Sequence, residues 1–249
     1  MPVVDRALAS AIAHRWHPVA APVSDANLHR LLGRLGPVER VLDLGCGFGE
    51  WLLAALEAAP QATGVGVDTS SPALDEARGR AQRRGLAERV TFEEADAASF
   101  EGVGFDAVLC VGATHAFGGL AGTLDAVRAH LRPGGRVLLG EGFWDGEPTP
   151  QAMSALGAEP GELPDLAGLV ETARRAGYEP GYGHVSSAEE WDDYEWSWTG
   201  SLTEWALTEA GDADRASALA MAGTHREEWL AGYRGQLGFL TLVLHDTGT

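Results

Sequence analysis

Short apolar runs alternate with helix-length segments through most of the chain. Amphipathic stretches at 50–59, 72–85 and 120–132 predict helices, the last of them ended by "RPGG". Between the helices, near-continuous apolar runs are typical of strands in a parallel sheet that is covered on both faces. The predicted strands are "RVLDL" (40–44), "TGVGVD" (63–68), "VTFEEAD" (90–96), "FDAVLCVG" (105–112) and "GRVLLGE" (135–141). The alternation therefore predicts a doubly wound, Rossmann-like α/β fold.

The pattern loosens after the fifth predicted strand. Residues 143–164 are rich in glycine and proline and are expected to be irregular. Further elements are predicted as a helix at about 163–176 and strands at 182–187 and 237–246. The residues between these last two strands look helical, begin with Ser187 and Glu190 in capping-box spacing, and are too many for a simple connection. We therefore expect a helical cap insertion at about 188–236.

The N-terminal region is predicted to be a helical addition to the sheet. The leucines of "ANLHRLLGRL" (26–35) fall on one helix face, so residues 1–36 are expected to form a helical lid segment. The main domain would then occupy 37–249. Charged residues interrupt the first apolar stretch, as in Asp5 and Arg15, so neither a signal peptide nor a membrane helix is expected.

The negative net charge of the chain disfavours some classes of binding partner. The chain has 36 acidic residues against 18 basic ones, all of them arginine, which gives a net charge of −18. Such a surface repels nucleic-acid backbones and anionic lipid headgroups, so we expect no nucleic-acid or membrane partner. Cys46 and Cys110 lie inside apolar runs, which argues against a disulfide and favours the cytoplasm. We expect a cytoplasmic protein, monomeric or homodimeric, that acts on a small molecule.

A glycine-rich turn follows the first predicted strand in "VLDLGCGFGE" (41–50). A dinucleotide fingerprint requires G-x-G-x-x-G; Gly45 and Gly47 fit it, but Glu50 stands where the third glycine belongs. The run is instead D-x-G-x-G-x-G, beginning at Asp43. An NAD(P)-dependent oxidoreductase remains an alternative, and Glu50 opposes it.

Four segments in consistent order resemble the class I S-adenosylmethionine-dependent methyltransferases. They are "VLDLGCGFGE", "GVGVDTSS", "FEEADA" and "CVGATHAFGG". The last of them is similar to a poorly characterised bacterial small-molecule subgroup related to the ubiquinone and menaquinone biosynthesis methyltransferases. The resemblance implies a seven-stranded sheet whose last strand is antiparallel, and S-adenosyl-L-methionine as cofactor.

The same resemblance implies which residues contact the cofactor. An acidic residue at the end of the second strand, Asp68, would accept hydrogen bonds from the ribose hydroxyls, and Asp96 would accept one from the adenine amino group. The expected cofactor-binding residues are Asp43, Gly45, Cys46, Gly47, Gly49, Asp68, Thr69, Ser70, Asp96, Ala97, Val111 and Gly112.

Residues for acceptor chemistry are expected near the ends of the fourth and fifth strands. His115 follows the fourth strand and is a candidate general base, and Glu141 ends the fifth and is a candidate to orient or deprotonate the acceptor. For both, a purely structural role is the alternative. The candidate substrate pocket consists of His17, Trp144, Trp191 and Tyr194. Those aromatic side chains could equally form the core of the cap.

Other chemistries find little support in the sequence. The spacing of His14 and His17 would suit a metal, but no matched ligand cluster accompanies them, so no metal is expected. No serine lies in a nucleophile elbow, and no histidine has an evident acidic orienter. The expected function is methyl transfer from S-adenosylmethionine to a small-molecule acceptor. The alternatives are the nicotinamide oxidoreductase and an S-adenosylmethionine-binding protein without catalysis.

Overall fold

The computed structural model describes residues 6–248, which fall into two compact units. The first, here called the helical unit, comprises Met1–Val23, Phe143–Asp165 and Ser186–Gly238. The second, the sheet unit, comprises Ser24–Gly142, Leu166–Val185 and Phe239–Thr249. No helix in the described part of the chain is long and apolar enough to cross a membrane.

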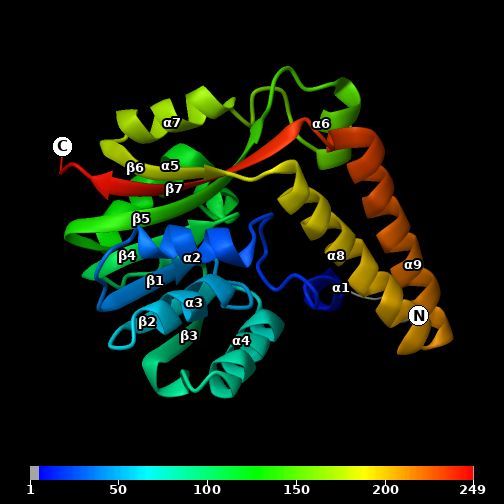
Figure 1. Ribbon diagram of the computed structural model, residues 1–249, viewed down its shortest axis with the longest axis horizontal. Helices are drawn as coiled ribbons and strands as arrows, with labels where there is room; N and C mark the ends of the chain where they lie inside the picture. Colours follow the sequence, from blue (N-terminus) through cyan, green and yellow to red (C-terminus); the bar gives the residue numbers. More distant parts are fainter. Residues whose placement is uncertain (1–5, 249) are drawn as a thin grey trace. The chain divides into compact units, whose positions relative to one another are not determined.

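A seven-stranded sheet forms the centre of the sheet unit (Figure 1). Its order is β3-β2-β1-β4-β5-β7-β6, so the strand order reverses between β1 and β4. The strands β3, β2, β1, β4 and β5 pair in parallel, and β6 pairs with β7 antiparallel. The strands are β1 (Arg40–Leu44), β2 (Thr63–Asp68), β3 (Val90–Glu94), β4 (Phe105–Val111), β5 (Leu131–Trp144), β6 (Tyr178–Val185) and β7 (Leu237–Asp246). The predicted α/β fold with seven strands is confirmed.

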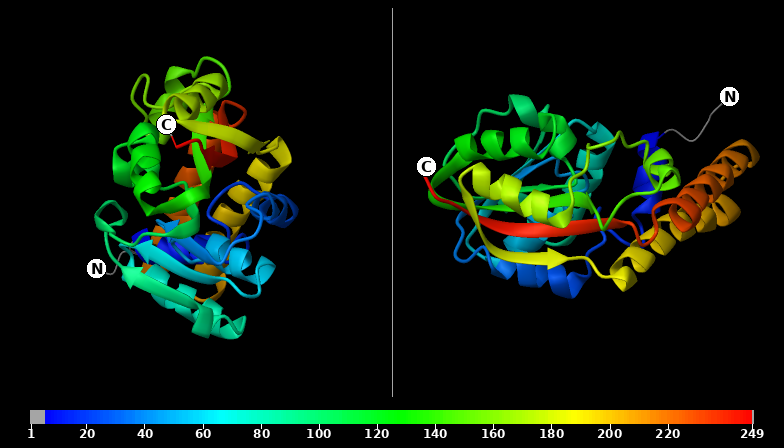
Figure 2. Two further views of the ribbon diagram at one scale, coloured as in Figure 1. Left: turned by 90° about the vertical axis from the view of Figure 1, so that its left-hand side faces the viewer. Right: turned by 90° about the horizontal axis from the view of Figure 1, so that it is seen from above.

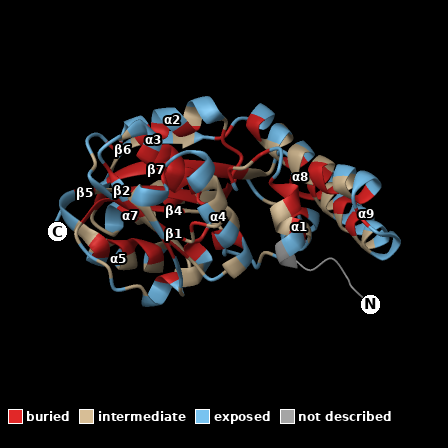
Figure 3. Cartoon of the chain, turned by 90° about the horizontal axis from the view of Figure 1, so that it is seen from below, coloured by how far each residue is buried: buried red, intermediate tan, exposed pale blue. Residues whose placement is uncertain are grey.

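Helices cover both faces of this sheet (Figure 2). They are α2 (Asp25–Gly33), α3 (Glu50–Ala58), α4 (Ser71–Arg83), α5 (Leu120–His130) and α7 (Leu166–Arg175), with short 3₁₀ turns η1 (Ala87–Arg89), η2 (Ala97–Ser99) and η3 (Thr114–Phe117). Figure 3 shows the central strands largely in the colour of buried residues, and Leu42, Val108 and Leu138 in β1, β4 and β5 are fully buried. Burial on both faces explains why these strands read as continuous apolar runs.

Glycines in β2 let a helix approach the sheet closely. A Cβ on Gly64 would lie 2.7 Å from a methyl carbon of Leu52 in α3. A Cβ on Gly66 would lie 2.9 Å from the sulfur of Cys46 and 2.8 Å from the ring of Phe92. The alternating glycines of "TGVGVD" therefore remove side chains at two positions where neighbours already fill the space.

Two apolar clusters organise the helical unit. It contains α1 (Arg6–Ala13), α6 (Pro150–Leu156), α8 (Ala188–Thr208), α9 (Asp212–Glu227) and a π-helical turn, η4 (Glu228–Tyr233). One cluster consists of Ala9, Ile12, Leu202, Ala206, Ala218 and Ala222. The other consists of Trp144, Ala152, Trp229 and Tyr233, with Trp191 packed against it. Small residues on α8 and α9 let these two helices lie close together.

The predicted boundaries of the fifth strand and its preceding helix were wrong. Helix α5 ends at His130, and β5 begins at Leu131, so "RPGG" lies inside the strand. The register shifts between Phe105 and Ala107 of β4, which pair with Leu131 and Arg136. The glycines and proline therefore mark an irregularity within the strand pairing rather than a loop.

Two further predictions between residues 143 and 187 were wrong. The segment expected to be irregular contains α6, which begins with Thr149 as N-cap and Pro150 in the first helical position. Strand β6 begins at Tyr178 and ends at Val185, four residues earlier at its start than predicted. Alternation in "YEPGYGHV" is weak because it contains glycine and proline, which explains the misplaced start.

The capping box at the start of α8 generates a stability prediction. The Ser187 hydroxyl accepts from the Glu190 amide at 3.2 Å, and the Glu190 carboxylate accepts from the Ser187 amide at 2.9 Å. Ser187→Ala should lower the free energy of unfolding by ~1 kcal/mol, measured by urea denaturation followed by circular dichroism. Ser197→Ala, in the interior of the same helix, should cause no loss. An equal loss in both variants would contradict the role of the cap.

Candidate active site

The predicted cofactor residues lie where the strand order reverses. The register pairs Asp43 with Gly66 on one side and with Leu109 on the other, so β1 has β2 and β4 as direct neighbours. Open α/β sheets bind ligands beyond the carboxyl ends of their strands at such a reversal. The turns that follow β1, β2 and β4 therefore form one edge of the sheet unit.

The glycine turn after β1 is fastened to the end of β2. The amides of Gly45 and Cys46 both donate to the carbonyl of Val67, at 2.8 and 3.0 Å. Gly45 has φ +74°, and a Cβ there would lie 2.4 Å from the Cβ of Ala113. Position 45 therefore requires glycine for two reasons: its φ is positive, and the turn after β4 leaves no space for a side chain.

Gly47 and Gly49 differ in how much space a Cβ atom would find at each position. Gly47 has φ +50° and open space where a Cβ would stand. Gly49 has φ +75° and is the N-cap of α3, and a Cβ there would meet the ring of Phe92 at 3.0 Å. Packing therefore explains Gly49, whereas the open space at Gly47 leaves its backbone accessible.

Asp68 at the end of β2 connects two turns. One carboxylate oxygen accepts from the amide of Gly47 at 2.8 Å, and the other accepts from the amide of Ser70 at 2.8 Å. Each oxygen keeps a second lone pair for another donor. The hydroxyl of Ser70 caps α4 by accepting from the amide of Ala73, and Thr69 between them is exposed. The structure thus gives Ser70 a capping role and orients Asp68 rigidly.

Asp43 is a buried carboxyl group with one orphaned oxygen. Its Oδ2 has no hydrogen-bond partner among the described residues, and the group is 3% exposed. Burial, and then the charge of Asp68, raise the pKa of Asp43 to about 8. A buried acceptor without a partner is costly, so this atom is suited to a donor supplied by a ligand.

Asp96 lies just past the end of β3. Its carboxylate accepts from the amide of Ala98 at 3.0 Å and so caps η2, which begins at Ala97. Helix η2 contacts η3, the turn that follows β4. Asp96 is exposed and Ala97 is buried. The third predicted acidic residue therefore lies on a turn that contacts the fourth predicted segment.

The end of β4 and the part of β5 beside it bring both candidate catalytic residues together. Strand β5 continues to Trp144, so Glu141 lies inside this strand rather than at its end as predicted. Val111 pairs with Gly140, and the amide of Gly112 donates to the carbonyl of Gly140 at 3.0 Å. Glu141 therefore lies beside the β4 turn. Its carboxylate accepts from the amide of Gly142 at 3.0 Å and bonds the side chain of Thr114.

The two candidates differ in how firmly they are held. Burial raises the pKa of Glu141, while its hydrogen bonds with Thr114 and Gly142 and the nearby His115 oppose the shift. His115 is exposed on η3, and its ring forms no hydrogen bond with any residue that the structure describes. Sequence reasoning missed Thr114 and Ala113; both follow directly after the motif glycine, Gly112.

Both cysteines are inert thiols. Burial, followed by the charges of nearby carboxylates, raises the pKa of Cys46 far above its usual range and that of Cys110 to about 12. Both are free and buried. Cys46 lies in the turn after β1, and Cys110 lies in β4. Cys46 is thus a backbone and packing residue of the glycine turn, not a nucleophile.

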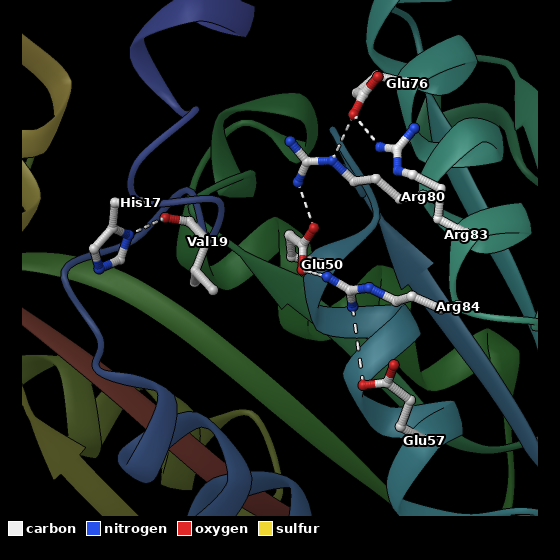
Figure 4. Close-up of polar contacts among 8 residues, drawn as sticks. All are labelled: His17, Val19, Glu50, Glu57, Glu76, Arg80, Arg83 and Arg84. Atoms are coloured by element: carbon white, nitrogen blue, oxygen red, sulfur yellow. Dashed lines mark hydrogen bonds and ion pairs between the residues drawn. The ribbon is translucent and has the colours of Figure 1, made fainter. Parts of the chain in front are cut away.

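The four predicted substrate-pocket residues all belong to the helical unit. The rings of Tyr194 and His17 meet edge to face at 5.3 Å, and those of Trp191 and Tyr194 at 6.4 Å. Trp144 is 5% exposed and shares an apolar cluster with Trp191. The Nε1 of Trp191 is buried with no partner among the described residues. The His17 ring is fixed by the carbonyl of Val19 at 2.8 Å (Figure 4).

A buried carboxylate lies at the centre of the helical unit. Glu195 is 2% exposed; one oxygen accepts from the hydroxyl of Tyr233 at 2.8 Å, and the other lies 2.7 Å from Nε2 of His225. The ring of His225 stacks on Trp198 with centroids 4.0 Å apart. The expectation that no histidine has an acidic orienter was therefore wrong for His225. These residues lie far apart in sequence, so spacing gave no signal.

The sheet unit fits an adenosyl cofactor on its own geometry. The open backbone at Gly47, the free lone pairs of Asp68 and the orphaned oxygen of Asp43 offer acceptors for hydroxyl and ammonium groups. A pyrophosphate would meet the carboxyl groups of Asp43 and Asp68 here, which opposes a dinucleotide. Among the described residues, no group of three or more metal-ligating side chains exists.

Removal of the Asp68 carboxylate should weaken cofactor binding. Asp68→Ala loses the amide contacts that shape the turn and the lone pairs expected to receive the ribose hydroxyls. Affinity for S-adenosylhomocysteine should fall by at least ~1.5 kcal/mol in isothermal titration calorimetry. Asp75→Ala, on the exposed face of α4, is the matched control and should bind like the wild type. Unchanged affinity in Asp68→Ala would remove the ribose assignment.

The raised pKa of Asp43 makes stability depend on pH. Between the unfolded value of 3.8 and the folded value of about 8, the folded protein keeps a proton that the unfolded chain has lost. Wild-type stability is therefore lost through this group as pH rises across that window. An asparagine at this position cannot ionise, so the Asp43→Asn variant does not lose stability in this way. In the ligand-free protein, the free energy of unfolding of Asp43→Asn minus that of the wild type should increase by ~1–3 kcal/mol from pH 5 to pH 8.

Urea unfolding at a series of pH values measures this difference. Asp125→Asn, on the exposed face of α5, is the control and should run parallel to the wild type. Parallel curves for Asp43→Asn would show that Asp43 is ionised in the folded protein.

Comparisons with known proteins agree with this geometry. A family model described as a methyltransferase domain matches residues 42–137. The chain is 37% identical over 185 residues to the uncharacterized protein YjhP of Escherichia coli K12, covering 73% of this chain and 74% of YjhP. It is 39% identical over 103 residues to demethylmenaquinone methyltransferase of Thermus thermophilus, covering 41% of this chain and 46% of that enzyme.

A solved structure extends the likeness to nearly the whole chain. The S-adenosylmethionine-dependent methyltransferase from Geobacter sulfurreducens, in complex with S-adenosyl-L-homocysteine, is similar with a TM-score of 0.86 and 29% identity. The match covers 98% of this chain and 99% of that one. The predicted family resemblance and cofactor are thereby confirmed. The chain belongs to the class I S-adenosylmethionine-dependent methyltransferases, and S-adenosylmethionine is its cofactor.

Proposed function

We propose that the enzyme methylates a small planar or apolar molecule that binds against the aromatic side chains of the helical unit. Those side chains are His17, Trp144, Trp191 and Tyr194. The ring of Tyr194 contacts those of His17 and Trp191, and Trp191 packs against the cluster that contains Trp144. In this proposal residues 1–36, of which 1–5 lie outside the described part of the chain, act as a lid segment, and 188–236 act as a cap on the methyltransferase domain 37–249. The aromatic wall is the observation that carries the choice of acceptor.

The cofactor is proposed to be held by the turns of the sheet unit. Backbone at Gly45, Cys46 and Gly47 would contact it beside Asp43, and Asp68 would receive its ribose. The other proposed contacts are Gly49, Thr69, Ser70, Asp96, Ala97, Val111 and Gly112. When bound, S-adenosylmethionine supplies a methyl group already activated on a sulfonium. The protein must chiefly align the acceptor and exclude water.

His115 and Glu141 are proposed to handle the proton of the acceptor. The His115 ring is exposed and forms no hydrogen bond within residues 6–248, so it is free to accept a proton from a hydroxyl or amine. Glu141 is held by Thr114 and by the amide of Gly142, so its carboxylate is fixed beside the β4 turn. The pair thus combines an exposed candidate base with a fixed acceptor of hydrogen bonds.

The acidic composition supports a small-molecule role in the cytoplasm. A net charge of −18 disfavours nucleic acids and membrane surfaces as partners. Two free, buried cysteines are compatible with a reducing compartment. We infer a cytoplasmic enzyme that is a monomer or homodimer.

A turnover assay tests the proposed acceptor class. Purified protein with S-adenosylmethionine should form S-adenosylhomocysteine when supplied with phenolic or other planar acceptors from a compound panel. NADH and NADPH serve as controls and should show neither binding nor oxidation. Tight cofactor binding with no turnover on any panel member would favour the binding protein without catalysis.

Variants of the proposed proton-handling pair separate binding from chemistry. His115→Ala should leave the affinity for S-adenosylhomocysteine near the wild-type value, because the ring contacts no cofactor-turn residue by hydrogen bond. Turnover on an acceptor found in the panel should fall by ~10²-fold or more. Glu141→Gln should also slow turnover, whereas His29→Ala on α2 should not. Equal turnover in His115→Ala would strip this residue of its proposed role.

A further inference from the structure

Glu50 is a buried carboxylate at the first position of α3. Only 8% of the residue is exposed, and it follows Gly49 directly at the end of the glycine turn. Its position is that of the third glycine in a dinucleotide fingerprint. A charged group is rarely buried unless it is paired, so its partners need explanation.

Two arginines of the neighbouring helical segment neutralise this carboxylate (Figure 4). One oxygen of Glu50 is bonded by a terminal nitrogen of Arg80, and the other is bonded by Nη2 of Arg84 at 2.5 Å. The Arg80 side chain is only 12% exposed. Each oxygen of one buried carboxylate thus holds a different guanidinium group.

The cluster extends outward through more exposed partners. Glu76 lies 3.1 Å from Nε of Arg80 and 2.7 Å from Nη2 of Arg83, and these three residues all belong to α4. Glu57, in the last turn of α3, lies 3.9 Å from Nη1 of Arg84. The buried centre is therefore Glu50 with Arg80, and the remaining members form its rim.

The cluster joins the two helices that begin at the cofactor turns. Helix α3 starts at Glu50, immediately after the glycine turn. Helix α4 is capped by Ser70, whose amide donates to Asp68. Because Glu50 is bonded to Arg80 of α4, the ion pair fixes the start of α3 relative to the helix that follows Asp68.

Arg80 also contacts the glycine turn itself. Its guanidinium carbon lies 5.2 Å from the centroid of the Phe48 ring, within the range of a cation–π contact. Phe48 stands between Gly47 and Gly49 and is 8% exposed. Glu50 holds the guanidinium of Arg80, and Arg80 in turn covers the side chain inside the turn.

We propose that Glu50 is a positioning residue for the adenosyl cofactor. Through Arg80 it holds Phe48, and thereby keeps the Gly47 amide directed at Asp68, the geometry on which cofactor binding rests. A buried ion pair adds little net stability compared with well-packed apolar residues, so its effect is expected in geometry. The inference rests on the assigned cofactor and adds a residue outside the binding turns.

Calorimetric binding of S-adenosylhomocysteine tests the proposal without an acceptor. Glu50→Gln removes the charge and keeps the shape, and it should weaken binding about tenfold at temperatures where circular dichroism shows the variant folded. Glu57→Gln is the matched control, because it lies on the same helix near the same Arg84 but is half exposed. It should bind within about twofold of the wild type. Equal affinities for Glu50→Gln and wild type would overturn the proposal, as would equal weakening in Glu57→Gln.

A second variant separates positioning from stability. Glu50→Gln alone leaves two arginines without their buried partner and could prevent folding. The double variant Glu50→Gln/Arg80→Met removes both central charges, and its urea-unfolding midpoint should recover toward the wild-type value. Its affinity should nevertheless stay about tenfold weaker than that of the wild type, because the contact of Arg80 with Phe48 is lost. If the double variant bound S-adenosylhomocysteine as tightly as the wild type, the ion pairs of Glu50 would have a structural role only, and the proposal would be overturned. Failure of the wild type itself to bind S-adenosylhomocysteine would instead overturn the cofactor assignment.

Discussion

The carboxylate of Asp68 accepts two backbone amides, and the rest of the cofactor site depends on this interaction. One amide belongs to Gly47 in the turn after β1, and the other belongs to Ser70 at the start of α4. The amides of Gly45 and Cys46 on the carbonyl of Val67 complete the attachment. A turn with so few side chains has little packing of its own, so hydrogen bonds from the neighbouring strand must fix its shape.

The fold was predictable because its signals are local and repeated. The bounds of β1, β2 and β7 coincide with the apolar runs that predicted them, since these strands are buried and end at glycine or acidic residues. The helix α6 and the true start of β5 were missed because glycine and proline dominate "FWDGEPTP" and "RPGG". In both places tertiary pairing or a helix cap overrode the turn-forming tendency of single residues.

The candidate site was only partly predictable, for a different reason. Asp43 and Asp68 lie at the carboxyl ends of β1 and β2, and Asp96 follows β3, so their position at one sheet edge is implied by parallel topology. The contact of Gly45 with Ala113, and the bond of Glu141 with Thr114, join segments about 70 and 30 residues apart, which no short-range pattern encodes. The Glu50 cluster is of the same kind. A charge in a glycine position was visible in the sequence, whereas the arginines that neutralise it were not.

The helical unit contains a buried polar group of its own, the carboxylate of Glu195, which connects helical segments rather than a binding turn. Glu195 links α8 to His225 of α9 and to Tyr233 of the π-helical turn, in a unit whose core clusters are aliphatic and aromatic. The bonded carboxylate fixes the register of three helical segments, and π-helical turns are frequent at functional sites. Two units with separate cores therefore carry the two proposed tasks, cofactor binding and acceptor recognition.

A crystal structure of the protein with S-adenosylhomocysteine tests the central claim most directly. The account predicts the ribose hydroxyls on the Asp68 carboxylate, the adenine beside Asp96 and Ala97, and the amino-acid portion against the backbone of Gly45 to Gly47. Electron density for the nucleoside away from Asp43, Asp68 and Asp96 would contradict it.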